Sequence, residues 1–223
     1  IARSHGALPV RADDGGTAFP YSTKPREFFT TRHEIEAGIE TGRLEILEYK
    51  SCFTFEQETK FGAFVDTHYT LRMQAAADGD EMLKEFFKYI LNGSYGKFAL
   101  NVKRFKTWAV TDGEIPCNRY KWTLETHLPN GHFLWVRPSP GNRHQLKNVA
   151  TAASITGAAR AQLLRGIATC DRPLYCDTDS LICAGPGALE LDPKRLGAWK
   201  LEADADKVAI AGKKLYALWN EGC

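Results

Sequence analysis

The pattern of apolar and polar residues along the chain predicts a mixture of short strands and amphipathic helices. In the first third we expect a helix over residues 32–41. Thr31 is a typical capping residue, Glu34 falls in the first turn, and Gly42 follows as a stop. Strands are expected on either side of this helix, over residues 28–31 and 44–55.

Residues 59–97 predict two antiparallel helices joined by a polar turn at 77–80, with Asp80 as the N-cap of the second. The second helix carries two stripes at helical spacing. The apolar stripe contains Leu83, Phe86, Phe87 and Ile90, and the polar stripe contains Lys84, Lys88, Asn92 and Tyr95. Two lysines one turn apart favour an anionic ligand such as a triphosphate, and Gly96 is expected to end the helix. A solvated face with snorkelling lysines is the alternative.

The middle of the chain is rich in turn signals. Between residues 101 and 148, the dipeptides Asp112-Gly113, Asn130-Gly131 and Gly141-Asn142 occur among aromatic residues, which predicts β-hairpins. Residues 149–169 are alanine-rich and predict a helix with Arg160 on its face. From Trp199 onward the pattern returns to strands.

Two carboxylates, Asp177 and Asp179, lie one residue apart between the apolar runs 174–176 and 181–183. The runs suit buried strands, so we expect the acidic pair at the tip of a hairpin. Hard oxygen ligands suit Mg²⁺ or Mn²⁺, and paired ions of this kind stabilise the attacking and leaving oxygens of phosphoryl transfer. A solvated Asp-rich turn is the alternative, but the apolar flanks and the cationic helix favour a metal site.

Composition adds little about partners. The chain has 223 residues, 43% of them hydrophobic, and a formal net charge of +2, as expected for one or two modest globular domains. The six cysteines show no C-x-x-C spacing, so reduced, mostly buried thiols are expected. No signal peptide or transmembrane run is recognisable, so we expect a cytosol-like compartment and no membrane partner.

Three short motifs occur in order along the chain. They are Lys88-x-x-x-Asn92-Gly93-x-Tyr95-Gly96, the run Y-C-D-T-D-S at 175–180, and Lys214-Leu215-Tyr216. They resemble the fingers motif K-x-x-x-N-S-x-Y-G, the palm motif Y-x-D-T-D-S and the K-x-Y motif of B-family DNA polymerases, with Gly93 in place of the usual serine. Residues 192–199 are similar to the stretch that joins the last two motifs in the protein-primed branch of that family, and the resemblance is weakest between 101 and 148.

The resemblance implies an α+β fold with a polymerase palm, in which an antiparallel sheet carries the Asp177/Asp179 hairpin and long helices cover its rear face. It divides the chain into a palm-associated segment (1–58), a helical fingers insert (59–101), a β-hairpin-rich insertion (102–148), and a palm part with the metal-binding hairpin and the K-x-Y strand (149–223).

The implied activity is template-directed DNA synthesis, in which a primer 3′-hydroxyl attacks the α-phosphate of a nucleotide with the help of two Mg²⁺ or Mn²⁺ ions. Asp179 would be a direct metal ligand and Asp177 a weaker or water-mediated one. The implied nucleotide-binding residues are Lys84, Lys88, Asn92, Tyr95 and Arg72, and the implied DNA-binding residues are Gly96, Thr178, Lys214 and Tyr216. The implied partners are a DNA primer–template, deoxynucleoside triphosphates and, for the protein-primed branch, a terminal protein; an RNA or DNA primer is equally compatible with these motifs.

One family motif, D-x-x-S-L-Y-P, does not occur in the sequence. The run Asp13-Asp14-Gly15-Gly16 has no apolar strand before it and is expected to be a surface loop. We therefore expect an incomplete segment of a longer polymerase that acts in a cell or phage-host cytoplasm, and no nucleotide incorporation by the isolated chain. The alternatives are a non-catalytic nucleic-acid-binding fragment and, with a poorer fit around Ser180-Leu181, a D-x-D phosphohydrolase.

Overall fold

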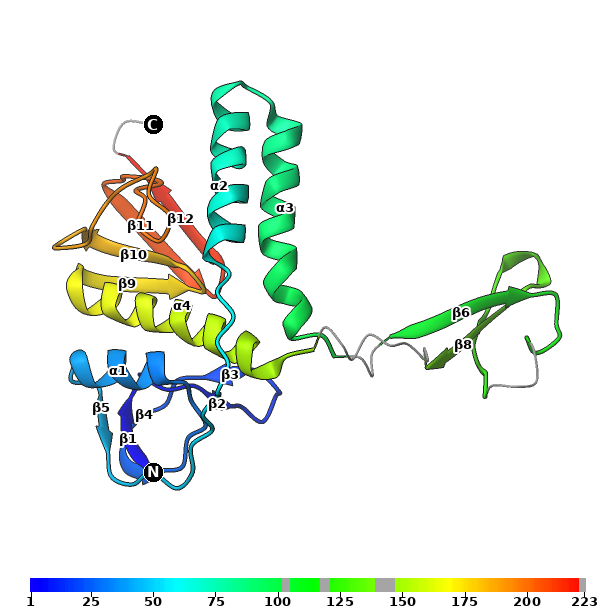
Figure 1. The fold of residues 1–223 in the computed structure, drawn as a ribbon, viewed down its shortest axis with the longest axis horizontal. Helices are drawn as coiled ribbons and strands as arrows, with labels where there is room; N and C mark the ends of the chain where they lie inside the picture. Colours follow the sequence, from blue (N-terminus) through cyan, green and yellow to red (C-terminus); the bar gives the residue numbers. More distant parts are fainter. Residues whose placement is uncertain (102–104, 117–120, 139–146, 221–223) are drawn as a thin grey trace.

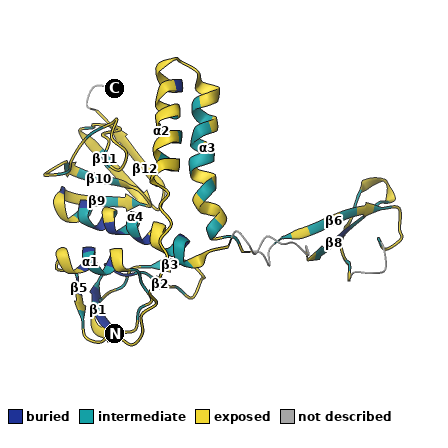
Figure 2. Cartoon of the chain, viewed as in Figure 1, coloured by how far each residue is buried: buried dark blue, intermediate teal, exposed yellow. Residues whose placement is uncertain are grey.

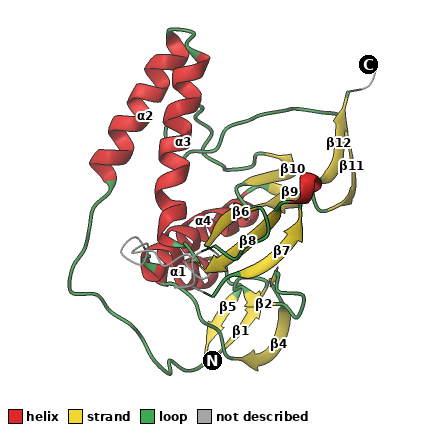
Figure 3. Cartoon of the chain, turned by 90° about the vertical axis from the view of Figure 1, so that its right-hand side faces the viewer, coloured by secondary structure: helices red, strands yellow, loops and turns green. Residues whose placement is uncertain are grey.

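The computed structural model describes residues 1–101, 105–116, 121–138 and 147–220 (Figure 1). This part of the chain contains α-helices and small antiparallel sheets, in agreement with the expected α+β class. The strands of every sheet in this part of the chain pair antiparallel, so the helices and strands, red and yellow in Figure 3, do not form parallel β–α–β units. Within the described residues, no helix is both long enough and apolar enough to cross a membrane.

The N-terminal sheet has the strand order β4–β1–β5, with β1 (Ala2–His5) between β4 (Tyr21–Arg26) and β5 (Leu44–Ile46). Both pairings are antiparallel, and Ser4 faces Ser22 on one side and Leu44 on the other. The predicted strand over 44–55 is therefore too long, because β5 pairs only along the short β1.

The predicted strand over 28–31 is wrong, because these residues pair with no strand of the described chain and lead directly into the first helix, with Phe28 packed against the core. A second short hairpin consists of β2 (Val10–Arg11) and β3 (Thr17–Ala18). The turn between them is the acidic run at 13–16, where Asp14 accepts a hydrogen bond from the backbone N–H of Gly16 at 2.7 Å. This run is a surface loop, as expected.

Helix α1 (Arg32–Glu40) confirms the first predicted helix. At its start the Glu34 carboxylate accepts the backbone N–H of Thr31 at 2.9 Å, which satisfies a donor that the helix leaves open. Gly42, at φ +67°, reverses the chain just after the helix, a conformation that glycine adopts without steric cost.

Helix α4 (Val149–Thr169) has the bounds that the sequence predicts. It lies between α1 and the later strands, so the main core forms between α1, α4 and the N-terminal sheet (Figures 1 and 2). The buried core residues are Ala2, Ala7, Leu8, Ala37, Leu44, Ala161 and Leu164. Small residues on α4 permit close packing, since a Cβ at Gly157 would overlap the Thr31 side chain and one at Gly166 would overlap Trp199.

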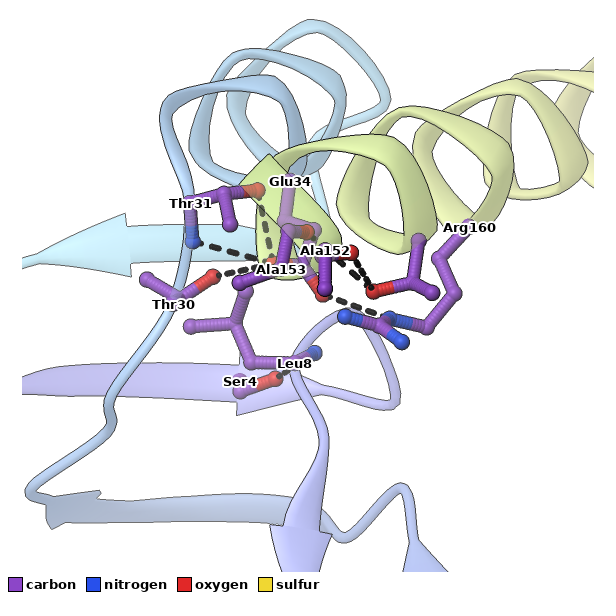
Figure 4. A network of polar contacts seen from close by, with 9 residues as sticks. Ser4, Leu8, Thr30, Thr31, Glu34, Ala152, Ala153 and Arg160 are labelled. Atoms are coloured by element: carbon purple, nitrogen blue, oxygen red, sulfur yellow. Dashed lines mark hydrogen bonds and ion pairs between the residues drawn. The ribbon is translucent and has the colours of Figure 1, made fainter. Parts of the chain in front are cut away.

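A buried ion pair joins α1 to α4 (Figure 4). Arg160 donates from Nε to Glu34 at 2.7 Å, and the Glu34 side chain is only 2% exposed. The same carboxylate accepts the hydroxyls of Thr30 and Thr31 at 3.0 and 2.8 Å. Burial by itself raises the pKa of Glu34, but the hydrogen bonds from Arg160 and Thr31 outweigh burial, so the pKa lies below its ordinary value.

Helices α2 (Gly62–Ala77) and α3 (Glu81–Phe98) form the predicted pair of neighbouring helices. Asp80 caps α3 by accepting the backbone N–H of Leu83 at 2.9 Å. The prediction that Gly96 ends this helix is wrong, because α3 continues through it to Phe98. A Cβ at Gly96 would meet nothing within 4 Å, so the glycine lies on an open helix surface.

The β-rich part after α3 is a sheet of order β6–β8–β7, formed by β6 (Lys106–Thr111), β7 (Thr123–His127) and β8 (Phe133–Pro138). A short 3₁₀ segment, η2 (Pro129–Gly131), links β7 to β8 and contains the predicted Asn-Gly turn. The predicted turn at Gly141-Asn142 lies outside the described residues. Figure 1 shows the sheet apart from the helices.

Two further hairpins complete the described chain. Strand β9 (Asp171–Asp177) pairs with β10 (Ser180–Gly185), and β11 (Lys207–Gly212) pairs with β12 (Leu215–Trp219). Each pair forms a two-stranded sheet in the part of the chain that the structure describes, so a wider sheet around the acidic hairpin is not observed there. Strand β10 packs against α4. Free thiols occur at Cys52, Cys170, Cys176 and Cys183, as expected, but the prediction that they are mostly buried is wrong for these four, because Cys52 and Cys176 are exposed and only Cys170 is buried. Cys117 and Cys223 lie outside the described residues.

Candidate active site

The acidic turn lies between β9 and β10, as the sequence predicts, but the expectation that both flanking strands are buried is wrong. Leu174 and Cys176 are exposed and residues 181–183 are only half-buried, because the two strands form a two-stranded sheet that packs on α4 through β10. Asp177 ends β9 and pairs with Ser180 at the start of β10. The reversal is tight, since the backbone N–H of Asp179 donates to the carbonyl of Asp177 at 2.6 Å and Thr178 adopts φ +53°. Asp177 is half-buried and Asp179 is exposed, so a ligand can approach the Asp179 carboxylate from solvent.

The Asp177 side chain is held within the turn. The Thr178 hydroxyl donates to Asp177 Oδ1 at 3.0 Å, and the Ser180 hydroxyl donates to the Asp177 carbonyl at 3.0 Å. Thr178, for which the family resemblance implies a DNA contact, orients a carboxylate in this structure.

The K-x-Y segment forms the second turn. Lys214 was expected in a strand, but it lies in the turn between Gly212 and Leu215, which pair directly, and it adopts the left-handed φ of +61°. Tyr216 lies in β12, as predicted. Lys214 and Tyr216 therefore do not share a face through strand alternation, because a turn residue does not follow the alternation of a strand.

These two turns meet. The backbone N–H of Lys214 donates to the Tyr175 hydroxyl at 2.9 Å, and the rings of Tyr175 and Tyr216 pack with centroids 5.6 Å apart. The Lys214 ammonium lies 3.5 Å from Asp177 Oδ2. The fold thus brings together the second and third motifs, and Tyr175 joins them. Sequence reasoning missed this role for Tyr175, although its place beside the carboxylates in the motif was a signal.

The donor set of the acidic turn fits a divalent cation with open coordination positions. Asp177 and Asp179 offer hard carboxylate oxygens, and Mg²⁺ is commonly bound through one or two carboxylates together with waters and substrate phosphates. In the described ranges, no cluster of three or more His, Cys, Asp or Glu side chains suits a metal. Two carboxylates alone leave coordination positions of such a cation open to water or to a phosphate.

The lysines of α3 have partners that sequence reasoning missed. Lys84 Nζ lies 2.8 Å from Glu81, and Lys88 Nζ lies 3.1 Å from Glu85. Each glutamate precedes its lysine by three residues, a spacing at which side chains on a helix are neighbours. The repeated E-x-x-K pattern was the available signal. Both ammonium groups remain partly exposed, so an anion can compete with these surface carboxylates.

The other residues of the polar stripe differ in their surroundings. Asn92 and Gly96 are exposed. Tyr95 lines an apolar groove of about 430 Å³ between α2, α3 and α4, together with Phe61, Phe64, Val65, Leu91, Ser94, Phe98 and Ile155. A planar ligand could therefore stack beside Tyr95, but the groove offers almost no polar groups to bind one.

Helix α2 contributes Arg72, which is half-buried and has no ion pair within the described part of the chain. One turn earlier, the Tyr69 hydroxyl donates to the carbonyl of Lys194 at 3.1 Å, which links α2 to the loop after β10. Asp192 orders this loop by accepting the backbone N–H groups of Lys194 and Arg195, and these two bonds lower the pKa of Asp192.

The structure therefore joins the acidic turn directly to the K-x-Y turn, whereas the polar stripe of α3 lies on a separate element. Asp177, Lys214 and Tyr216 meet around Tyr175. The cationic stripe belongs to α3, which packs on α2 and α4, while the acidic hairpin packs on α4 through β10. Helix α4 is thus the support that both groups share.

Comparison with known proteins places the chain among DNA polymerases. Residues 3–182 match the family described as DNA polymerase type B, organellar and viral. The chain is 45% identical to the DNA-directed DNA polymerase of Enterobacteria phage PRD1 over 219 residues, which cover 97% of this chain and 38% of that protein.

More distant relatives are also phage DNA polymerases. The DNA polymerases of Bacillus phages Nf and phi29 are each 27% identical, over 86% and 82% of this chain and 31% and 29% of their own lengths. The chain thus spans less than two fifths of the length of these relatives. No solved structure matches it significantly. The resemblance seen in the three motifs is confirmed: the chain belongs to the type B DNA polymerase family of organelles and viruses.

Proposed function

We propose that this chain is part of a template-directed DNA polymerase that transfers nucleotides to a primer 3′-hydroxyl. The observation that carries the proposal is the meeting of the acidic turn with the K-x-Y turn around Tyr175. Carboxylates for a cation and a lysine for a phosphate then lie at one point, as nucleotidyl transfer requires. The family match favours this reaction over the D-x-D phosphohydrolase.

In this proposal residues 149–223 belong to the palm and residues 1–58 to an associated segment. Residues 59–101 form the fingers, and residues 102–148 form an insertion. The partners are a DNA primer–template, deoxynucleoside triphosphates and, by analogy with the protein-primed branch, a terminal protein. Because the relatives are phage proteins, we place the activity in the host cytoplasm.

Asp179 and Asp177 would hold Mg²⁺ or Mn²⁺. Such a cation, when bound, supplies charge stabilisation to the phosphoryl oxygens. Thr178 orients the Asp177 carboxylate, and Tyr175 fixes the position of the Lys214 backbone. Lys214 and Tyr216 would contact the primer end without reading its sequence.

The polar stripe of α3 would bind the incoming nucleotide. Lys84 and Lys88 would exchange Glu81 and Glu85 for the triphosphate, whose higher charge makes it the stronger partner. Arg72 on α2 would add a further cation. Asn92 and Tyr95 would line the nucleotide pocket, and Gly96 would allow DNA to approach the helix closely, since nothing lies within 4 Å of its missing side chain.

Primer extension by the complete enzyme tests the acidic turn. Asp179→Ala should abolish nucleotide incorporation with Mg²⁺ or Mn²⁺ while the circular dichroism spectrum stays unchanged. Asp13→Ala removes a carboxylate from the β2–β3 turn and serves as the matched control, with activity near that of the wild type. Robust extension by Asp179→Ala would overturn the assignment.

Steady-state kinetics test the cationic stripe. Lys88→Ala should raise the KM for nucleotide and lower kcat, because the lysine meets charge that grows on the leaving pyrophosphate. Lys24→Ala, on the exposed strand β4, is the control and should change neither constant. If Lys88→Ala instead weakens DNA binding at unchanged nucleotide kinetics, Lys88 contacts the template.

A further inference from the structure

The ion pair between Lys214 and Asp177 is a consequence of how the two hairpins dock. The left-handed backbone of Lys214, the hydrogen bond from its N–H to the Tyr175 hydroxyl, and the packing of Tyr175 on Tyr216 fix the base of the lysine side chain beside the acidic turn. With its base fixed there, the ammonium lies 3.5 Å from Asp177 Oδ2. The contact is therefore specified by the tertiary structure and not by neighbours in sequence.

The two partners differ sharply in their exposure to solvent. The side chain of Asp177 is 20% exposed, whereas that of Lys214 is 70% exposed. A largely covered carboxylate is stabilised by a nearby positive charge, because it has lost part of its hydration. An exposed ammonium keeps most of its hydration and can move away from its partner at little cost.

We propose that Lys214 is the resident counter-ion of Asp177 and that its ammonium competes with a divalent cation for this carboxylate. This inference rests on the proposed metal site and gives Lys214 a role at the acidic turn in addition to its proposed primer contact. Lys214 is a positioning residue in this role. Because coupling between two ligands is reciprocal, a phosphate that draws Lys214 away from Asp177 would strengthen cation binding at the turn.

Mn²⁺ binding without DNA provides the test, with the free Mn²⁺ followed by electron paramagnetic resonance. Lys214→Ala should lower the Kd for Mn²⁺ about two- to fivefold, the range expected for removal of one exposed ion pair. Lys213→Ala is the matched control, because it removes the same charge from the same turn and Lys213 has no ion pair among the residues described. Its effect should be clearly smaller.

Two more variants test whether the change in Kd comes from the contact between Lys214 and Asp177. In an Asp177→Asn background, Lys214→Ala should no longer change the Kd, because the competing pair is gone. Tyr175→Phe removes the hydroxyl that holds the Lys214 backbone and should lower the Kd in the same direction as Lys214→Ala. This second variant keeps the lysine and tests the same contact without a change in net charge.

The outcomes test the counter-ion role of Lys214 and the metal site separately. The counter-ion role is refuted if Lys214→Ala weakens Mn²⁺ binding, or if it changes the Kd no more than Lys213→Ala does. The metal site stands in either case as long as Mn²⁺ binding still depends on Asp177 and Asp179. If Asp177→Asn and Asp179→Asn leave Mn²⁺ binding unchanged, the metal site itself is refuted and the counter-ion role falls with it.

Discussion

Removal of the Arg160 guanidinium should destabilise the protein far more than removal of the Arg165 guanidinium. Both arginines lie on α4 and pair with glutamates of α1, at 2.7 Å for Arg160–Glu34 and 2.6 Å for Arg165–Glu40. The two pairs differ in burial. The arginines are similar, with Arg160 32% and Arg165 43% exposed, but Glu34 is 2% exposed whereas Glu40 is 54% exposed, so the difference lies in the carboxylate that each substitution leaves unpaired. Substitution by methionine keeps most of the aliphatic stem of each arginine, so the comparison isolates the charge.

The expected magnitudes follow from burial. Breaking a buried pair by removing one partner costs about 3–5 kcal/mol, because it leaves an uncompensated charge. Glu34 keeps hydrogen bonds from Thr30 and Thr31, so we expect the lower end, about 3 kcal/mol, for Arg160→Met. An exposed pair contributes about 0–1 kcal/mol, which is the loss expected for Arg165→Met.

Urea unfolding followed by circular dichroism measures both losses, provided that the m-values stay equal to that of the wild type. A third variant, Glu34→Gln combined with Arg160→Met, should recover part of the loss, because it leaves no uncompensated charge and the amide oxygen can still accept from Thr30 and Thr31. Equal losses for the two single variants, within about 0.5 kcal/mol, would refute the reasoning from burial.

The pKa of Glu34 is lowered in the folded protein, so its contribution to stability is complete above the unfolded pKa of about 4.3 and is lost as the pH falls through the folded pKa. The urea concentration at the unfolding midpoint should therefore decrease as the pH is lowered below about 4.3, and it should decrease less steeply for Arg160→Met than for the wild type. Parallel pH profiles for the two proteins would contradict this. Gly157→Ala should lower stability by about 1–3 kcal/mol, because its Cβ would overlap the facing threonine, whereas Gly93→Ala on open α3 should raise it by up to about 1 kcal/mol, both measured by thermal unfolding. In the complete enzyme, Lys214→Ala should weaken binding of primed DNA of any sequence and reduce the slope of log affinity against log salt by about one phosphate contact, as measured by fluorescence anisotropy. An unchanged slope would remove Lys214 from the primer interface.

Local signals in the sequence were sufficient for the helices and for the acidic hairpin. Helix α4 has the predicted bounds, and α1 follows its predicted capping threonine. The turn at Asp177 lies where two apolar runs predicted a reversal. These features depend on residues close together in the chain, whose propensities and turn chemistry act locally.

The features that the sequence did not predict depend on distant partners. Strand β4 is mostly polar and exposed, and it is a strand because it pairs with β1. The ion pair between Glu34 and Arg160 spans 126 positions, and the bond from Lys214 to Tyr175 spans 39. No periodicity in either segment encodes such contacts, because each depends on how separate elements dock.

The pairing of Lys84 and Lys88 with glutamates was missed for a different reason. These contacts are local, and the spacing was readable, but the lysines were considered without the acidic residues three positions before them. A charge pattern on a helix has to be read with both signs together.

The composition of the core has a consequence for synthesis of the protein on the ribosome. The core joins Ala2, Ala7 and Leu8 to Ala161 and Leu164, so its two sides are separated by most of the chain. The α2–α3 pair and the β6–β8–β7 sheet lie between them and consist of contacts between neighbours in sequence. The contact between the N-terminal sheet and α4 closes a long segment of chain and therefore forms late. The α2–α3 pair and the β6–β8–β7 sheet can fold before α4 has left the ribosome. During that interval the N-terminal strands are covered by α1 but not by α4, so their core face is open to mispairing or to capture by a chaperone.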